Sequence, residues 1–434
     1  MHTTALQLGT GQSLCASFLA HELDPFEPSR ASSALRRTRI GSLPPSHDDD
    51  TDGESDPFES DPPRDPAKHV ERLAKPFNSE TAQDVLSSSY LTPVDALYVR
   101  NHAPVPHIAD SAAHRVSFLD GETQVACASL SELGSRFRSV SVTSILQCAG
   151  NRAADDARGS GPNGFLGTPF EGLGCGMMGN VRWSGVRLSD LLPAMFPQLA
   201  ASGPASGPAS DAAAGLHVIF EGADGYESST PVQAVLSEHG DCLLATHMNG
   251  EPLAADHGFP CRALLPGIAG ARSVKWVTAI RLSDRPSSAP WNKSYYRRAD
   301  DTEVQALPLQ SVILQPTHQQ HVALDADGKL RVQGVAYPGA GGAPIERVEL
   351  STDDGRSWHA ATILREEVLP DDAKAPHHWV RWVARVPLSG AGAQTVCCRA
   401  MDLSGQTQPR VSEKQRGYLF NGWFRVDLTV GSSG

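Results

Sequence analysis

Residues 140–152 read VSVTSILQCAGNR, and this stretch decides both the fold and the chemistry expected of the chain. The β-branched and aliphatic run Val140–Leu146 is typical of a buried strand, and the Gly-Asn pair after the cysteine begins a turn. Cys148 therefore lies where a rigid strand enters a loop, a position at which functional side chains are common. Arg152 and Arg158 would favour its thiolate, the form of cysteine that binds metals. Judged from these residues alone, a cysteine packed in the core remains the alternative.

Strands and short helices are expected on both sides of this stretch, from about Leu91 to Asp284. Runs of β-branched and aliphatic residues bounded by Gly, Asp or Asn predict strands. The predicted strands are Val140–Leu146, Leu216–Gly222, Leu243–Met248 and Val274–Leu282, and the predicted helices are Arg187–Met195 and Val232–Ser237. The repeated Ser-Gly-Pro-Ala of Ala200–Ala214 predicts a surface loop. This part of the chain indicates a mixed α/β domain.

The pattern changes at about Pro308, where apolar and polar residues begin to alternate between Asp-Gly, Gly-Gly and Ser-Gly turns. The alternating segments are Lys329–Tyr337, Ile345–Ser351, Trp358–Leu364, Trp379–Leu388, Thr395–Met401 and Trp423–Val430. Short strands at this spacing predict an immunoglobulin-like β-sandwich, although the Cys…Trp…Cys spacing of antibody domains is absent. Such a sandwich is usually a binding or dimerisation module, and the whole chain is assigned to the α+β class.

Length and composition exclude several classes of protein. With 434 residues the chain should form two folded units. A net charge of −12 and the lack of a basic stripe argue against a nucleic-acid partner. No apolar run is long enough for a membrane span. The eight cysteines form no CxxC pair, which argues against a disulfide framework or a zinc site.

The first 75 residues are predicted to be a disordered extension because they are acidic, rich in Ser and Pro, and poor in periodic hydrophobicity. They show no secretory signal. We therefore expect a soluble intracellular protein, whose compartment (cytoplasm, peroxisome or mitochondrion) stays open. No glycine-rich phosphate motif follows a predicted strand, which argues against nicotinamide and nucleotide enzymes.

Several further motifs occur in a fixed order along the chain. The first domain contains VRNHAPVP at Val99–Pro106, LQCAGNR at Leu146–Arg152, VRWSGVRLSDL at Val181–Leu191, MNGEP at Met248–Pro252, DHGFPCR at Asp256–Arg262 and PGIAGARSVKW at Pro266–Trp276. The second contains LPLQ at Leu307–Gln310, Ile345–Asp353 with Trp358, and RGYLFNGWFRV at Arg416–Val426. Together these motifs resemble the sulfite oxidase family, and the resemblance covers about Lys75 to Val430.

The resemblance implies a molybdopterin-binding catalytic domain at 76–305 and an immunoglobulin-like dimerisation domain at 306–430. It implies Cys148 as the thiolate ligand of molybdenum, since soft sulfur donors suit a metal that cycles between oxidation levels. Residues implied to contact the molybdopterin are Tyr98, Val99, Arg100, Asn101, His102, Asp224, His257, Arg262, Ser273, Val274 and Lys275. For Asp224 and His257 the alternative is a structural role in a turn or loop.

The resemblance also implies the reaction, which is oxidation of sulfite to sulfate. Arg100, Arg416 and Tyr296 match the family's anion-contacting arginines and its active-site tyrosine, and arginine can hold a dianion without losing its own charge. Tyr295 is the alternative to Tyr296 if the loop shifts by one residue. No haem-binding segment is found before residue 75 and no flavin module after residue 430. We expect a haem-free homodimer that passes electrons to oxygen or to an external acceptor.

Two departures from the family pattern affect the expected anion site. Ala153 stands where the family has a second arginine, and Leu173 stands where a pocket tryptophan is expected. Arg158 or Lys293 is a candidate to replace the missing charge. If neither does so, the anion binds more weakly or the substrate differs.

Two other functions are weighed against sulfite oxidation. The first is a nitrate reductase-like molybdenum enzyme, although Gln147 and the run Ala271–Ser273 resemble sulfite oxidases instead. The second is a catalytically retired relative that acts as a binding protein, which Ala153 favours and the retained Cys148 opposes.

Overall fold

The structure is a computed structural model that describes residues 56–431, with gaps at 156–169, 171, 203–212, 238–240, 366–367, 370–376 and 414–415. Most of the expected disordered extension and most of the expected loop 200–214 therefore lie outside the described residues. The predicted extension is too long at its C-terminal end, because the chain is placed from Asp56 onward and forms strand β1 at His69–Leu73. Arg64 holds this segment to the first domain through Asp256.

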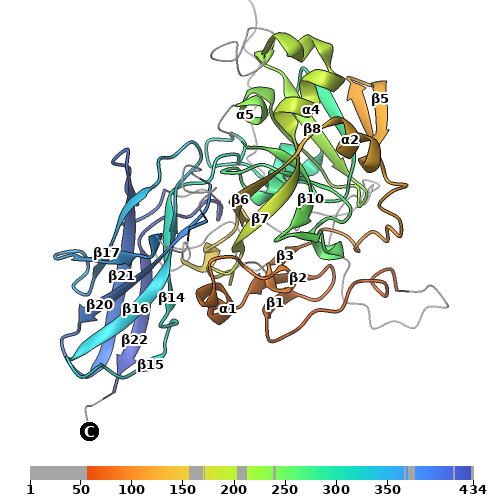
Figure 1. Ribbon diagram of the computed structural model, residues 1–434. Coiled ribbons are helices and arrows are strands. Elements are labelled where there is room, and N and C mark those ends of the chain that lie inside the picture. The colour runs from red at the N-terminus through yellow and green to blue at the C-terminus, as the bar shows by residue number, and fades with distance from the viewer. Residues whose placement is uncertain are drawn as a thin grey trace, which may run out of the picture. The chain divides into compact units, whose positions relative to one another are not determined.

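The first domain is built from three sheets (Figure 1, right). Its small sheet has the order β1-β2-β3, with β2 at Asn78–Thr81 and β3 at Val99–Arg100. The second sheet has the order β11-β10-β7-β6, with β11 at Glu251–Pro252, β10 at Leu243–Met248, β7 at Met178–Arg187 and β6 at Ser139–Gln147; β12 at Arg262–Leu264 pairs with β10. The third has the order β5-β4-β13-β8-β9, with β5 at Thr123–Ser129, β4 at Arg115–Asp120, β13 at Val277–Ser283, β8 at His217–Gly222 and β9 at Glu227–Pro231.

Short helices accompany these sheets: α1 at Gln83–Ser88, α2 at Leu130–Arg136, α4 at Leu188–Met195 and α5 at Val232–Leu236. Helix α2 begins with a capping box in which the Ser129 and Glu132 side chains satisfy each other's backbone N–H groups. Helix α4 buries its Leu and Met side chains in the domain core. The predicted mixed α/β class is confirmed, and the strands and helices predicted from Val140 to Leu282 correspond to β6, β8, β10, β13, α4 and α5.

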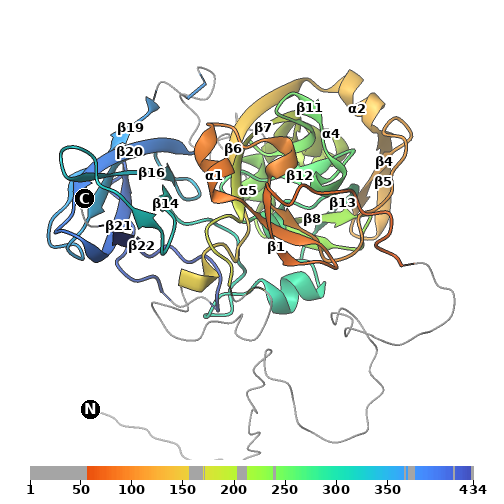
Figure 2. The same ribbon diagram turned by 90° about the horizontal axis from the view of Figure 1, so that it is seen from below.

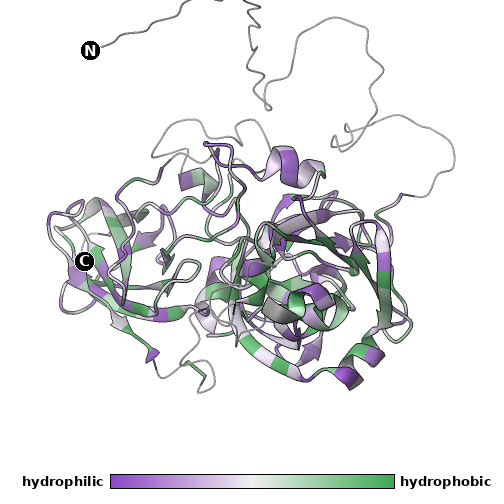
Figure 3. Ribbon diagram, turned by 90° about the horizontal axis from the view of Figure 1, so that it is seen from above, coloured by the Kyte–Doolittle hydropathy of each residue, from purple (hydrophilic) through white to green (hydrophobic). Residues whose placement is uncertain are grey.

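The second domain is a sandwich of two sheets (Figures 1 and 2, left). One sheet has the order β14-β16-β20-β19, with β14 at Gln310–Gln315, β16 at Lys329–Tyr337, β20 at Val380–Pro387 and β19 at Thr362–Ile363. The other has the order β15-β22-β21-β17-β18, with β15 at His321–Val322, β22 at Phe424–Val430, β21 at Gly392–Asp402, β17 at Ile345–Ser351 and β18 at His359–Ala360. Figure 3 shows hydrophobic residues within the strands of both domains. The predicted sandwich is therefore present.

Each of the two domains contributes side chains to the hydrophobic core of the other. Ile145 and Met178 of the first domain pack into the hydrophobic core of the sandwich. In return Tyr418 and Leu419, which precede β22, pack into the core of the first domain. The backbone N–H of Leu419 donates to the carbonyl oxygen of Ala149 at 2.8 Å, so the turn that follows Cys148 rests on the second domain. In the part of the chain that the structure describes, no helix is long and apolar enough to cross a membrane.

Candidate functional site

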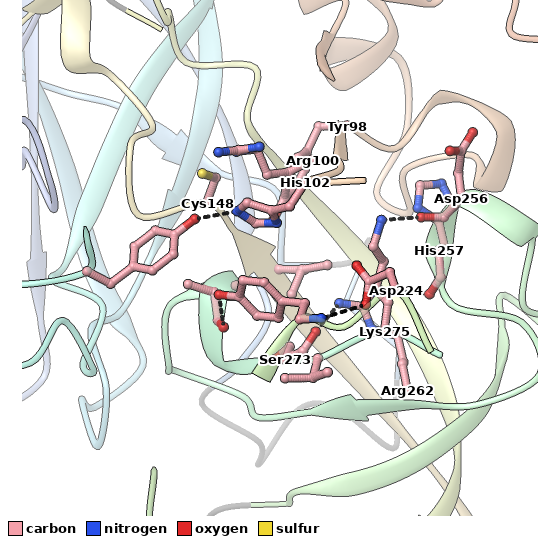
Figure 4. Close-up of a pocket in the computed structure, with 16 residues that line it drawn as sticks. Tyr98, Arg100, His102, Cys148, Asp224, Asp256, His257, Arg262, Ser273 and Lys275 are labelled. Carbon is pink, nitrogen blue, oxygen red and sulfur yellow. Dashed lines mark hydrogen bonds between the residues drawn. The ribbon is translucent and has the colours of Figure 1, made fainter. Parts of the chain in front are cut away.

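Most of the residues singled out by the sequence line one pocket of the first domain, here called the central pocket. The space between its lining residues is about 590 Å³ when the solvent at the open side is counted. Figure 4 shows side chains converging on it from the loops at the ends of several strands. The pocket is lined by Tyr98, Arg100, His102, Leu146, Cys148, Asp224, Tyr226, Asp256, His257, Arg262, Gly270, Ala271, Ser273, Val274, Lys275 and Tyr296.

Three residues expected to contact cofactor or substrate do not line the central pocket. Val99 is buried in β3, where it pairs with Ser79 of β2. The Asn101 side chain lies behind the lining and bonds to Asp256 and Lys275. Arg416 is partly buried at a left-handed φ of 56°, two residues before Tyr418.

Cys148 follows directly on β6 and is 8% exposed. Its backbone N–H donates to the carbonyl oxygen of Met177 at 2.9 Å, which continues the pairing of β6 with β7 past the strand end. Burial raises the pKa of the thiol, and the guanidinium of Arg100 opposes that shift. The thiol is thus held at the pocket wall by a rigid strand, beside a cation that favours its ionised form.

The prediction that Arg152 favours the thiolate form of Cys148 was wrong. This side chain is fully buried, at a left-handed φ of 68°, and it points away from the central pocket into the domain interface. Its guanidinium donates to Asp155, to Gln310 Oε1 and to the carbonyl oxygen of Gly422, each at 2.8 Å. With its donors used in this way, Arg152 braces the turn, and Arg100 is the cation that acts on Cys148. Arg158 lies outside the described residues.

Arg100, His102 and Tyr296 line the pocket on the side of Cys148, and Figure 4 shows Arg100 and His102 next to that thiol. Nη1 of Arg100 donates to Asn78 Oδ1 at 3.0 Å and to the Asn101 carbonyl oxygen at 2.7 Å, which fixes the guanidinium plane. Nε2 of His102 lies 3.3 Å from the Tyr296 hydroxyl. Burial, together with the nearby Arg100 and Lys275, puts the pKa of His102 well below its ordinary value, so the ring is neutral. Burial raises the pKa of Tyr296, so its hydroxyl keeps its proton.

The opposite end of the central pocket collects basic groups and their partners. Arg262 donates to the carbonyl oxygens of His257 at 3.1 Å and of Ser273 at 2.8 Å, and its guanidinium lies 5.2 Å from the centroid of the Trp183 ring. Lys275 Nζ donates to Asn101 Oδ1 and, at 2.8 Å, to the carbonyl oxygen of Asp256. Burial lowers the pKa of Lys275 to about 7 against the attraction of Asp256. Such groups gain from an anion that arrives beside them, because it offsets their burial.

Of the two expected substitutes for the missing arginine, Lys293 does not line the pocket and Arg158 lies outside the described residues, and both changed positions are buried. Ala153 is fully buried, and Leu173 is 2% exposed in the same core cluster. The Ala154 N–H donates to the Leu173 carbonyl oxygen at 2.9 Å. Lys293 is exposed in the π-helix Trp291–Tyr295 and is not part of the lining, while Arg158 is not among the described residues.

Sequence reasoning did not single out Tyr226, Asp256 or Gly270, all of which line the pocket. Tyr226 stacks on His102 at a centroid distance of 4.6 Å, and its hydroxyl donates to the Ala271 carbonyl oxygen. A Cβ on Gly270 would lie 2.7 Å from the Tyr98 hydroxyl and 2.9 Å from the Gln147 carbonyl oxygen, so only glycine fits. Asp256 and Gly270 sit inside quoted motifs, whereas Tyr226 carries no local signal.

Among the described residues no group of three His, Cys, Asp or Glu side chains could hold a metal ion. Cys148 is the one soft donor among the described residues of the pocket lining. A metal held there must take its other ligands from a cofactor, and an organic dithiolene with a phosphate matches what the pocket provides. The thiol supplies a sulfur ligand at one end, and Arg262 and Lys275 suit a phosphate at the other. The residues present therefore fit a molybdopterin.

Comparison with known proteins gives a consistent result. The oxidoreductase molybdopterin binding domain matches residues 102–291, and the Mo-co oxidoreductase dimerisation domain matches residues 301–431. A sulfite oxidase of Gallus gallus is 35% identical over 90% of this chain and 84% of its own length. A nitrate reductase [NADH] of Ulva prolifera is 32% identical over 77% of this chain and 40% of its own length. The sulfane dehydrogenase SoxCD of Paracoccus pantotrophus has the same fold, with a TM-score of 0.62, 23% identity, and coverage of 89% of this chain and 92% of that one.

Proposed function

The chain belongs to the sulfite oxidase family of molybdopterin-dependent oxidoreductases, and on that premise we propose that it oxidises sulfite to sulfate. One observation carries the proposal. The central pocket brings a buried thiol (Cys148), a cation (Arg100) and a protonated hydroxyl (Tyr296) to one wall, from three distant parts of the sequence. These are the groups needed to hold a metal and an oxyanion side by side.

In this proposal the two ends of the pocket have different tasks. Cys148 is the metal ligand, and Arg262, Lys275 and Ser273 hold the phosphate of the molybdopterin. Tyr98, His257 and Asp224 line the pterin between them, with Val99 and Asn101 supporting the wall from behind. The chemistry that the bound cofactor would supply is transfer of an oxygen atom to the sulfur of sulfite with uptake of two electrons.

Arg100 binds the sulfite oxyanion in this arrangement. Asn78 and the Asn101 carbonyl engage its Nη1, so the guanidinium presents its remaining donors to an anion without first having to be ordered. A planar, permanently charged group suits paired hydrogen bonds to two sulfite oxygens. Arg416 is proposed to add charge at the pocket mouth, because Tyr418, two residues on, has its ring 5.6 Å from that of Tyr296.

Tyr296 orients the substrate by donating a hydrogen bond from its hydroxyl. Its raised pKa keeps the proton in place, and the neutral His102 ring 3.3 Å away fixes the direction of the hydroxyl. His102 is itself held between Tyr226, stacked at 4.6 Å, and Trp291 at 4.3 Å. These aromatic rings also exclude water from the wall, which strengthens the attraction between Arg100 and the oxyanion.

We further propose that the enzyme is a haem-free homodimer that forms through residues 306–430 and passes its electrons to oxygen or to an external acceptor. The match of residues 301–431 to a dimerisation domain supports the dimer. An intracellular compartment is proposed with it.

The test combines metal analysis with turnover on one preparation of the full chain. Wild-type protein should contain molybdenum and pterin, and sulfite should reduce ferricyanide or drive oxygen uptake. Cys148→Ser should abolish turnover with the fold intact, since a serine oxygen is a harder donor than a thiolate. Cys242→Ser is the matched control, because that thiol is also buried but lies outside the pocket lining. Wild-type protein without molybdenum, or full turnover by the Cys148 variant, would refute the proposal.

Nitrate reduction is the second candidate function. Among the described residues, Arg100 is the one arginine that lines the Cys148 end of the central pocket, and a single cation suits a monoanion such as nitrate better than it suits a dianion. The similarity to a nitrate reductase supports testing it. Nitrate-dependent oxidation of reduced viologen, measured on the same preparation, distinguishes the two substrates.

A further inference from the structure

The segment before β1 reaches the central pocket through a single arginine. Arg64 donates from Nε to Asp256 Oδ2 at 2.9 Å and from Nη2 to Asp256 Oδ1 at 2.8 Å. Nη2 also donates to Asp61 at 3.1 Å, and the guanidinium lies 4.2 Å from the centroid of the Phe77 ring. Asp61 is anchored in turn by the backbone N–H of Val105 at 2.9 Å. Arg64 is therefore fixed on three sides, with its side chain 13% exposed.

Asp256 connects Arg64 to the residues that hold Lys275. Its Oδ1 also accepts a hydrogen bond from Asn101 Nδ2 at 3.1 Å. Because the amide nitrogen of Asn101 is used in this way, its amide oxygen faces the other direction and accepts from Lys275 Nζ. A chain of contacts thus leads from Arg64 through Asp256 and Asn101 to the ammonium group of Lys275.

The ammonium group of Lys275 has three N–H donors, and this chain determines what they face. One goes to Asn101 Oδ1 and one to the Asp256 carbonyl oxygen, and the group also lies 4.2 Å from the Trp276 ring. The charged groups near Lys275 are Asp256, Arg262, Asp224 and Arg100, and its burial lowers its pKa to about 7. Lys275 therefore gains from any further anion that reaches it inside the pocket.

We propose that Arg64 is a positioning residue for the molybdopterin phosphate: by saturating the Asp256 carboxylate, it keeps the Lys275 ammonium group available for that phosphate. This inference rests on the phosphate contact of Lys275 in the proposed function. Without Arg64, the largely buried Asp256 carboxylate lacks its main partner. The flexible cation beside it is Lys275, which then pairs with Asp256 in place of the phosphate.

The experiment measures release of pterin from the full-length holoenzyme. Wild type, Arg64→Ala, Arg64→Lys and Arg64→Ala/Asp256→Asn are diluted into cofactor-free buffer, and the oxidised pterin is followed by its fluorescence. Arg281→Ala is the matched control. Arg281 makes a similar two-donor contact to Glu221, at 2.9 and 2.6 Å, with its side chain 17% exposed, but it does not line the pocket.

We expect Arg64→Ala to release pterin roughly tenfold faster than wild type, which is the loss of about one charge-assisted hydrogen bond. Arg64→Lys should fall between the two, since lysine keeps the charge but not the fork. The double variant should return towards wild type, because the neutral amide introduced by Asp256→Asn no longer competes for Lys275. A merely structural role for Arg64 predicts no such rescue, and it predicts the same effect for Arg281→Ala.

Two outcomes overturn the inference while leaving the proposed function in place. In the first, Arg64→Ala releases pterin at the wild-type rate. In the second, the double variant releases it as fast as Arg64→Ala does. Wild-type protein that contains no pterin would instead refute the proposed function, and the inference with it.

Discussion

Replacing Arg152 by alanine should be one of the most damaging single changes in this protein, although Arg152 does not line the central pocket. The change removes hydrogen bonds to Asp155, Gln310 and the Gly422 carbonyl, each 2.8 Å long. It also removes a cation that lies 4.9 Å from the centroids of both the Phe420 and Phe424 rings. Asp155 and two neutral acceptors would be left without this partner in the interior.

The expected loss of stability follows from the burial of the pair. The Arg152 side chain is 0% exposed and that of Asp155 is 11% exposed. Removing one partner from a buried pair of this kind costs about 3–5 kcal/mol of unfolding free energy. For a domain of this size, that lowers the midpoint of thermal unfolding by about 6–20 °C. Arg152→Lys should recover part of the loss, because lysine can replace one of the three hydrogen bonds.

The assay is thermal and urea unfolding of wild type, Arg152→Ala and Arg152→Lys at equal protein concentration. Arg385→Ala is the control, because Arg385 pairs with Asp325 and Asp327 on the exposed face of the sandwich and its loss should change little. The two domains should also unfold less cooperatively in Arg152→Ala, since Gln310 belongs to β14 of the sandwich. An unfolding free energy within about 1 kcal/mol of wild type would show that this account of Arg152 is wrong.

Three further predictions concern pH, packing and assembly. Burial lowers the pKa of Lys275 to about 7, so between about pH 7 and pH 10 the unfolded chain binds a proton that the native chain lacks. The cofactor-free protein should therefore become more stable as the pH rises through that window. Unfolding midpoints that rise no more steeply with pH than those of Lys275→Met would contradict this. Ala153→Arg should destabilise the fold instead of improving sulfite binding, because residue 153 is fully buried; a lower Michaelis constant at unchanged stability would disprove it. The purified protein should show no Soret band and should sediment as a dimer at micromolar concentration; a haem spectrum or a monomer would count against the proposed assembly.

Strands of the first domain could be predicted from the sequence where β-branched residues form continuous runs. A strand was missed where close packing against its neighbours requires small residues. Strand β7, ten residues long, was not predicted. It pairs with both β6 and β10, so its backbone is covered on both edges. A Cβ on Gly185 would lie 2.1 Å from the Leu244 carbonyl oxygen, which requires glycine at this position of the strand. The residues of β7 therefore have a low strand propensity, although β7 lies in the middle of the sheet between β6 and β10.

The candidate site was predictable to the extent that its residues lie within ordered motifs. The residues quoted around Cys148, Arg100 and Lys275 do line one pocket. Partner choice was not predictable, because it depends on contacts between segments far apart in the chain. Arg152 looked like a companion of Cys148 from the same short turn, yet two of its partners lie 158 and 270 residues further along. Arg64 reaches Asp256 across 192 residues, and no local pattern marks either contact.

The missing second arginine changes how charge is distributed inside the pocket. At the far end of the pocket, the lining carboxylates Asp224 and Asp256 both act on Lys275, and Asp256 is also held by Arg64. At the Cys148 end the His102 ring is neutral and Tyr296 keeps its proton, which leaves Arg100 as the charged group among the described residues that line this end. An anion is therefore drawn to the thiol end of the pocket even though the whole chain carries a net charge of −12. Because that attraction depends on one guanidinium, substrate binding should be more sensitive to salt and to the loss of Arg100 than in a pocket with two such arginines.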